Sequence, residues 1–514
     1  MFSSQLQPTL GDGDEQRVDI SLASIGRTNR LHSEEEQLHI RNILLAAESL
    51  LQSGTVDGDL RRREETVDLI DRCKIALAPH KRLPPDVLRF IFQICHELKP
   101  WFSSTSSWSR ADTCPLYITH VCSAWRRLAL ETPALWNNIG VYLSRDARLE
   151  QHIRTLSFAR HWFDRAQDMR RSLFIDFDVE AYSPHLHDSW EQLLEFMAQY
   201  DRLEELDLEY PINSLALKLP DHVWPSIERL HLVRDGERPS EGQQLFSNFG
   251  KLSNLGHLKI SGSRYLDGMD RIVPWHQLRT LKVEAVTPSS CLNVLRQSRL
   301  LEHCCITLSK ELSFTSTVIS TKENIVLADM DHFEAEFSDG LAVPMFLQPL
   351  VMPNIARFCL RRAGPYLPKL SCDMSALIGI IQRSGGMRRI RRLRIDASFP
   401  ALDIGIFLEL LPSLESISIE SGYLDDNTIT RLSTGKLGPR LCDIDLCCLH
   451  DADQILSMVE SRYQNATQSP DSEQNTPCPF RFIRILCKAP VNDDRIDLLF
   501  EKCDAIICLD FDKD

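Results

Sequence analysis

The stretch Leu414-Glu415-Ser416-Ile417-Ser418-Ile419 has apolar residues at its first, fourth and sixth positions, and this spacing returns along most of the 514-residue chain. Its second half alternates apolar and polar residues, as a strand with one buried face does. Clear copies begin at Leu203, Ile227, Leu255, Leu278, Ile355, Ile390, Leu414 and Leu441, and weaker ones at Leu301, Met330 and Phe480. Successive copies are mostly 23 to 29 residues apart, so the sequence predicts an array of structural repeats.

Helix-like runs lie between the copies, at 190–200, 292–299, 376–383, 404–411 and 452–462. A unit of one strand and one helix cannot bury its apolar side alone, whereas stacked units can. We therefore expect an α/β fold with parallel strands on a concave face and helices outside. Segments 135–143 and 172–179 are predicted to be earlier strands of the array, and 505–511 its last strand.

This array resembles the leucine-rich-repeat family. The Asn that usually follows the strand in that family is missing, and the equivalent positions hold residues such as Pro211, Val286 and Leu449. The resemblance implies a leucine-rich-repeat horseshoe, and the missing Asn ladder implies that its repeats are irregular.

The polar positions of each predicted strand are expected to face away from the core. They hold Glu205, Asp207 and Glu209, then His257 and Lys259, then Arg357, Arg361, Arg392 and Arg394, and finally Asp443 and Asp445. The exposed sheet face is thus predicted to run from acidic to basic to acidic. Our hypothesis is that the four arginines bind an acidic or phosphorylated segment of a target protein, because guanidinium groups suit carboxylate and phosphate. The alternative is an ordinary solvated sheet face, where any polar residue serves.

A second informative stretch, Leu83-Pro84-Pro85-Asp86-Val87-Leu88, precedes the array. Proline is favoured in a first helical turn and Asp suits the helix dipole there, so a helix should begin near Pro85. Two apolar rows follow on this helix, one made by Leu88, Ile91, Phe92 and Cys95 and the other by Val87, Phe90 and Ile94. Such a helix needs packing partners on two sides.

The related block Val121-Cys122-Ser123-Ala124-Trp125-Arg126-Arg127-Leu128 follows after an insert at 97–119. Val121, Trp125 and Leu128 are spaced to share one helical face, and Thr132-Pro133 is expected to end that helix. The two blocks, with Leu135-Trp136 behind them, resemble the F-box-like module of fungal proteins.

The resemblance implies a module that docks the small adaptor subunit of an SCF ubiquitin ligase, which in turn binds the cullin. By position, the residues expected to dock are Leu83, Pro84, Leu88, Ile91, Phe92, Val121, Trp125 and Leu128. The insert departs from the family pattern and is expected to cover part of that face. Two other interpretations are ordinary core helices of an all-α cap, and a helix-turn-helix around Trp125-Arg126-Arg127. The net charge of −14 argues against nucleic acid as the partner.

The composition is that of a soluble globular protein, with 43% hydrophobic and 25% charged residues. No stretch approaches the roughly 20 apolar residues of a membrane span, and the N-terminus lacks a secretory signal, so an intracellular, cytoplasmic or nuclear, location is expected. The sixteen cysteines are then expected to be reduced thiols. Their spacing does not match paired zinc ligands, and we predict neither a metal site nor a cofactor.

The predicted domains are a disordered segment at 1–30, a helical hairpin at 31–80, the F-box-like module at 81–136 and the repeats at 137–514, with a loop at 464–479. Ser33-Glu34-Glu35-Glu36 is a capping box that should open the first hairpin helix, and the second should run from Asp59 to about Leu77.

Three functions are compatible with these features. The first is a non-catalytic substrate-recognition subunit of an SCF-type ligase, and the second is an F-box and leucine-rich-repeat scaffold acting outside ubiquitination. The third, an enzyme, lacks support because the sequence has no phosphate-binding glycine loop, nucleophile elbow or metal-spaced histidines. We therefore expect no catalytic residues.

Overall fold

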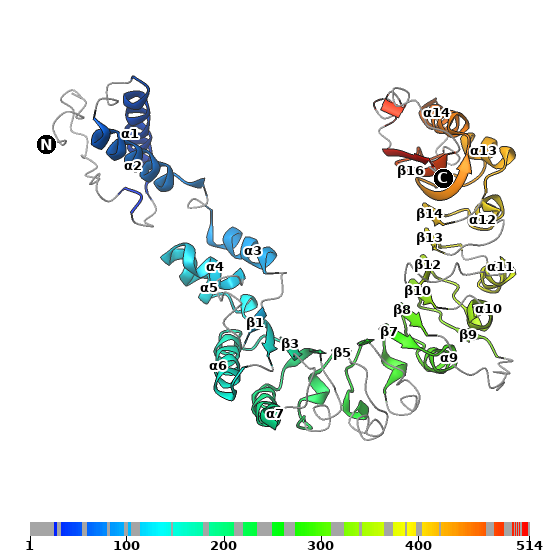
Figure 1. Ribbon diagram of the computed structural model, residues 1–514, viewed down its shortest axis with the longest axis horizontal. Coiled ribbons are helices and arrows are strands. Elements are labelled where there is room, and N and C mark those ends of the chain that lie inside the picture. The colour runs from blue at the N-terminus through cyan, green and yellow to red at the C-terminus, as the bar shows by residue number, and fades with distance from the viewer. Residues whose placement is uncertain are drawn as a thin grey trace. The chain divides into compact units, whose positions relative to one another are not determined.

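The structure, a computed structural model, describes residues 25–27, 32–53, 59–79, 83–96, 101–103, 114–144, 147–177, 184–209, 219–233, 249–261, 273–309, 323–338, 342–363, 374–385, 388–396, 403–420, 423–468, 477–487, 496–497, 499, 501, 503 and 506–511 (Figure 1). They fall into two compact units. The first unit comprises 1–102, 106–139 and 161–169, and the second comprises 103–105, 140–160 and 170–514.

The first unit begins with the predicted hairpin, made by α1 (Glu34–Gln52) and α2 (Leu60–Ala76). Ser33 and Glu36 form the capping box, and the Asp59 side chain caps α2 by accepting the N–H of Arg62. Ile25 is fully buried against the hairpin core, and Gly26, at φ +69°, lets the backbone pass close to α2. The expectation of disorder at 1–30 is therefore wrong for 25–27, because an apolar side chain anchors them; the rest of that segment lies outside the described residues.

Four short elements follow the hairpin in this unit: α3 (Pro85–Cys95), α4 (Cys114–Val121), α5 (Ser123–Leu130) and the 3-10 turn η3 (Pro133–Leu135). Helix α3 begins where the prolines predict. The prediction that Val121 and Leu128 share one helix is wrong, because the chain is extended at Cys122 and its Sγ caps α5. The predicted insert at 97–119 is partly regular structure, since it contains most of α4.

The second unit is built around a 15-stranded sheet. Its strands neighbour one another in the order of the sequence, beginning with β1 (Trp101–Ser103). The others are β2 (Asn138–Leu143), β3 (Arg171–Phe177), β4 (Leu203–Glu209), β5 (Arg229–Val233), β6 (His257–Ser261), β7 (Thr280–Val286), β8 (His303–Leu308), β10 (His332–Phe337), β12 (Arg357–Arg362), β13 (Arg392–Ile395), β14 (Ser416–Ile419), β15 (Asp443–His450), β16 (Phe482–Cys487) and β17 (Ile506–Phe511). Adjacent strands from β3 to β17 are parallel. This arrangement confirms the prediction of an α/β fold whose repeats contribute parallel strands.

The register follows the sequence pattern residue for residue. Leu230 pairs with Leu258, Leu258 with Leu281, and Leu281 with Cys304, so the fourth positions of successive copies stack across the sheet. The first, fourth and sixth positions of all eleven copies are buried. These columns form a continuous core, while the residues between them lie on the opposite face, here called the open face.

Helices occupy the other side of the sheet: α7 (Pro184–Met197), α9 (Pro288–Gln297), α10 (Ala342–Leu347), α11 (Met374–Arg383), α12 (Ile404–Leu410), α13 (Asp426–Ser433) and α14 (Ala452–Gln468). Figure 1 shows α9 to α14 along one side of the strands. Helix α6 (Leu149–Arg165), α10, α13 and a small sheet of β9 (Ile325–Val326) and β11 (Leu350–Val351) were not predicted. The predicted loop at 464–479 is partly wrong, because α14 continues to Gln468; 469–476 lie outside the described residues.

Candidate interaction surfaces

Helix α3 exposes the second of its two apolar rows. Val87, Phe90 and Ile94 stand at i, i+3 and i+7 and are 41%, 61% and 52% exposed. The next two helices of the module also expose large apolar side chains: Tyr117 and Val121 of α4, each 51% exposed, and Leu130 of α5, which is 40% exposed. These six side chains, here called the apolar face, are large hydrophobic groups that water solvates poorly.

Two residues of the first row of α3, Leu88 and Phe92, instead lie in the module's own core, whereas Ile91 is half-buried and Cys95 is exposed. Leu88 is 8% exposed and Phe92 only 1%, and Leu128 of α5 is 8% exposed. The rings of Phe92 and Trp125 meet edge to face with centroids 5.0 Å apart. Burying one such ring contributes about 1.5–3 kcal/mol, so this row holds α3 against α5.

The eight predicted docking residues therefore divide into two groups. Leu88, Phe92 and Leu128 are buried within the chain, where they stabilise the module. Of the others, Pro84 and Val121 are exposed, and Leu83, Ile91 and Trp125 are half-buried. Sequence reasoning recognised the row of Val87, Phe90 and Ile94 but did not assign it to docking. The sequence feature that could have indicated docking is that this helix has apolar rows on two sides, more than its own packing needs.

The open face brings the four predicted arginines together. Arg357 of β12 and Arg392 of β13 are register neighbours, and both are exposed. Arg361 forms an ion pair with Glu334 at 2.9 Å, and the Nε–H of Arg394 is shared between the two carboxylate oxygens of Asp396 at 2.9 and 3.0 Å. In the described part of the chain, Arg357 and Arg392 have no carboxylate within ion-pair distance.

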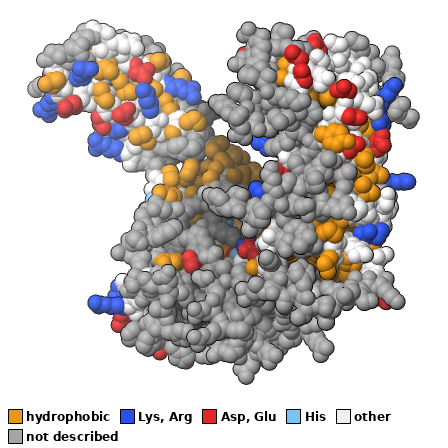
Figure 2. Space-filling model, turned by 45° about the vertical axis from the view of Figure 1, so that its right-hand side comes forward, with side chains coloured by type: hydrophobic (Ala, Val, Ile, Leu, Met, Phe, Trp, Pro, Cys, Tyr) orange, Lys and Arg blue, Asp and Glu red, His pale blue; other side chains and the backbone are white. Residues whose placement is uncertain are grey.

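Acidic residues interrupt the basic region. Glu334 and Glu336 of β10 precede it, and Asp396 lies beside it. Farther along, Arg484 of β16 pairs with Asp445 of β15 at 2.6 Å. The expected change from acidic to basic to acidic is therefore too simple. Figure 2 likewise shows Lys or Arg and Asp or Glu side chains intermingled on the side of the molecule it presents.

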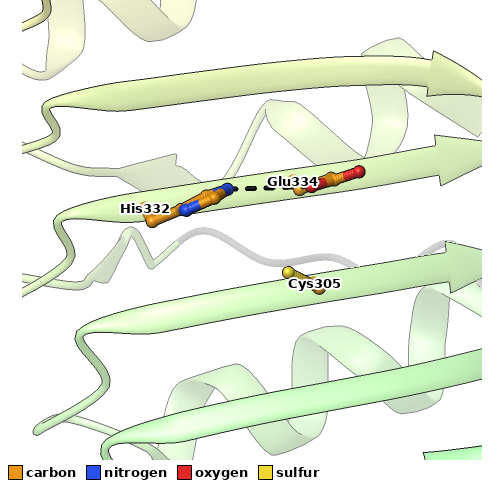
Figure 3. A group of neighbouring side chains, drawn as sticks. All are labelled: Cys305, His332 and Glu334. Atoms are coloured by element: carbon orange, nitrogen blue, oxygen red, sulfur yellow. Dashed lines mark ion pairs between the residues drawn. The ribbon is translucent and has the colours of Figure 1, made fainter. Parts of the chain in front are cut away.

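Three potential metal ligands meet at β8 and β10 on the open face. Ligand atoms of Cys305, His332 and Glu334 all lie within 4.8 Å of one another. Figure 3 shows Cys305 on one strand and the other two residues on the next. Burial lowers the pKa of His332 and raises that of the Cys305 thiol, in each case disfavouring the charged form.

Sequence reasoning missed this cluster because it searched for ligands close together in the chain. The available signal was the repeat register: Cys305 and Glu334 occupy the same polar slot in successive copies, and the structure pairs them directly.

Comparisons with known proteins give little direct guidance. No family model matches the sequence, and no curated protein matches it. Among solved structures, the chain is similar to that in "Crystal structure of Rad7 and Elc1 complex in yeast", with 15% identity over 82% of this chain and 90% of that chain, at a TM-score of 0.34. It is also similar to that in "Crystal structure of TLR13-ssRNA13 complex", with 10% identity over 74% of this chain and 52% of that chain, at a TM-score of 0.34.

No helix in the described segments combines the length and the apolar run that crossing a membrane requires. The repeat architecture rests on the strand register itself, since both structural likenesses are distant.

Proposed function

We propose that the chain is a non-catalytic substrate-recognition subunit of an SCF-type ubiquitin ligase. Helices α3, α4 and α5 dock the adaptor subunit and, through it, the cullin, while the open face of the repeats binds the target protein. The observation that carries this proposal is the apolar face, together with the F-box-like pattern of the same helices.

The apolar face is suited to a partner because its residues keep 40% to 61% of their surface exposed. Phe90, at 61%, has the largest exposed fraction of the six. A cluster of aromatic and aliphatic side chains that a partner can enclose is the usual centre of a protein interface. The docking set is therefore revised to Val87, Phe90, Ile94, Tyr117, Val121 and Leu130, with Leu83 and Pro84 retained at the start of α3.

For the target, we propose that Arg357 and Arg392 make the first contacts with an acidic or phosphorylated segment. Their charges face each other across β12 and β13 without a carboxylate partner in the described residues, so an incoming anion would relieve their repulsion. Arg361 and Arg394 already hold Glu334 and Asp396, so they would first have to exchange these partners.

Affinity capture of the tagged protein from cells tests the adaptor half of the proposal. Wild-type protein should recover both adaptor and cullin, and the double variant Val87→Glu, Ile94→Glu should recover neither. Ile153→Glu is the matched control, since Ile153 is 42% exposed on the part of α6 that belongs to the second unit. Recovery of adaptor without cullin would favour a scaffold outside ubiquitination, and recovery of neither by the wild type would refute the assignment.

The same capture tests the target half. Arg357→Glu with Arg392→Glu should keep the adaptor but lose the target proteins, whereas Arg440→Glu, an exposed arginine elsewhere in the second unit, should keep both. Unchanged target recovery by the double variant would show that these arginines do not bind the target.

A further inference from the structure

The cluster of Cys305, His332 and Glu334 offers the donor atoms of a transition-metal site. Thiolate sulfur, imidazole nitrogen and carboxylate oxygen are all zinc ligands in proteins. Such a mixed set favours zinc over magnesium or calcium, which take oxygen ligands.

The backbone positions these groups without strain. His332 and Glu334 are two residues apart on β10, so both project to the open face. Cys305 is the register neighbour of Glu334 on β8, one interstrand spacing away. The sheet therefore fixes the three Cα positions, and only side-chain torsions remain to be set.

The distances are close to those of a bound ion. His332 Nε2 and Glu334 Oε2 lie 3.7 Å apart, and all three ligand atoms lie within 4.8 Å of one another. Ligands at zinc bond lengths in a tetrahedron are about 3.5 Å apart. A movement of about 1 Å, within reach of side-chain rotation, would bring Cys305 into the site.

The local charges also fit a divalent ion. Ionised Cys305 and Glu334 together supply two negative charges, which match the charge of Zn²⁺. Arg361 holds Oε1 of Glu334 at 2.9 Å, and this contact orients the carboxylate with Oε2 toward His332. Glu336 and Asp396 lie 3.9 and 3.8 Å from the Arg361 guanidinium, so their negative charges screen its repulsion of the metal ion.

We propose that Cys305, His332 and Glu334 bind one zinc ion on the open face, with the fourth coordination position open to solvent. Binding joins the strands of two successive repeats, and it places a Lewis acid beside the arginines of β12. The sulfur–metal bond forms as the thiol proton is lost to solvent. This site is independent of the adaptor docking proposed above.

Titration of the full-length, chelator-treated protein with Co²⁺ tests the site, because a cobalt–thiolate bond gives an ultraviolet charge-transfer band. Wild type should develop this band with one equivalent of Co²⁺, and Zn²⁺ should displace it. Cys305→Ser should abolish the band, and His332→Ala and Glu334→Gln should each weaken binding by more than ~10-fold. Because these side chains are partly exposed, the variants are expected to fold, which circular dichroism checks.

Cys508→Ser is the matched control, since Cys508 is a half-buried cysteine on the same sheet at β17. This variant should bind Co²⁺ as the wild type does. A band that persists in Cys305→Ser, or a wild type that shows none, would overturn the proposal; so would wild-type affinity in both His332→Ala and Glu334→Gln.

Discussion

Replacing Arg462 by methionine should destabilise the last repeats more than any surface change. Arg462 of α14 is fully buried and donates to five backbone carbonyls, those of Leu432, Gly438, Pro439, Leu441 and Cys478, at 2.7 to 3.2 Å. Its guanidinium also lies 4.5 Å from the ring centroid of Phe480. Burial lowers its pKa to about 10, so it remains charged at neutral pH.

The loss of stability depends on which backbone carbonyls have no hydrogen-bond donor once the Arg462 guanidinium is removed. Those of Leu432, Gly438 and Pro439 also accept backbone N–H groups of Gly435, Leu441 and Cys478. For the carbonyls of Leu441 and Cys478, Arg462 is the donor that the structure shows. One buried carbonyl (Leu441) and one part-buried carbonyl (Cys478) left unsatisfied, at ~1–3 kcal/mol each, give a loss of ~4 kcal/mol. Methionine approximates the volume of the aliphatic stem, so the cavity term is small.

Hydrogen exchange followed by mass spectrometry measures this loss locally, which matters because a long repeat array need not unfold in a single step. A destabilisation of ~4 kcal/mol should speed the exchange of amides in β15 and β16 by ~10³-fold. The control Arg440→Met removes a nearby exposed arginine and should leave exchange unchanged. Wild-type exchange rates in Arg462→Met would refute the reasoning that this side chain satisfies buried carbonyls.

Two further changes test other parts of the account. Burial lowers the pKa of His152 from 6.5, although its hydrogen bond to the Ser144 carbonyl opposes this shift. The unfolded state therefore binds the proton more readily, and stability is lost as pH falls below 6.5. His152→Gln should flatten the pH dependence of the unfolding free energy between about pH 8 and about pH 5, and an unchanged slope would exclude this histidine as its source. Gly435→Ala should cost more stability than Gly385→Ala, because both glycines have φ +71° but only a Cβ at Gly435 would meet a neighbour, the Pro477 ring. We expect a loss of more than ~2 kcal/mol for Gly435→Ala and ~1 kcal/mol for Gly385→Ala in denaturant unfolding, and equal losses would contradict the predicted contact.

The repeat register could be predicted from sequence because period-two alternation leaves little freedom. If Leu230 and Leu232 face the core, then Arg229 and His231 must face away, and the structure places them so. Shifting the strand by one residue would bury charges and expose leucines. The same constraint acts in every copy, which is why even the weak one at Met330 is correct.

Helices α3, α4 and α5 were less predictable because helical spacing does not show where a helix breaks. Val121 and Leu128 fit one helical face, yet the extended conformation at Cys122 separates them. Cysteine is not among the usual capping residues, so the sequence contains no strong signal for the break. The two apolar rows of α3 were visible, but which row packs against α5 depends on Trp125, a tertiary contact.

The cluster of Cys305, His332 and Glu334 is intermediate in how far the sequence predicts it. Cys305 and Glu334 are far apart in the chain, so the sequence shows that they are neighbours in space only once the repeats are aligned with one another. The choice of His332 rather than His303 as the third ligand depends on side-chain torsions, and the aligned pattern leaves these open.

The central claim is that the apolar face docks the SCF adaptor subunit, and a calorimetric titration of the purified chain with that subunit tests it most directly. Phe90→Glu removes an apolar contact worth ~2 kcal/mol and would bury an unpaired carboxylate, so affinity should fall at least ~100-fold. The control Leu45→Glu changes a side chain that is 64% exposed on α1 and should bind as the wild type does. Wild-type affinity in Phe90→Glu, or an equal loss in Leu45→Glu, would contradict the account.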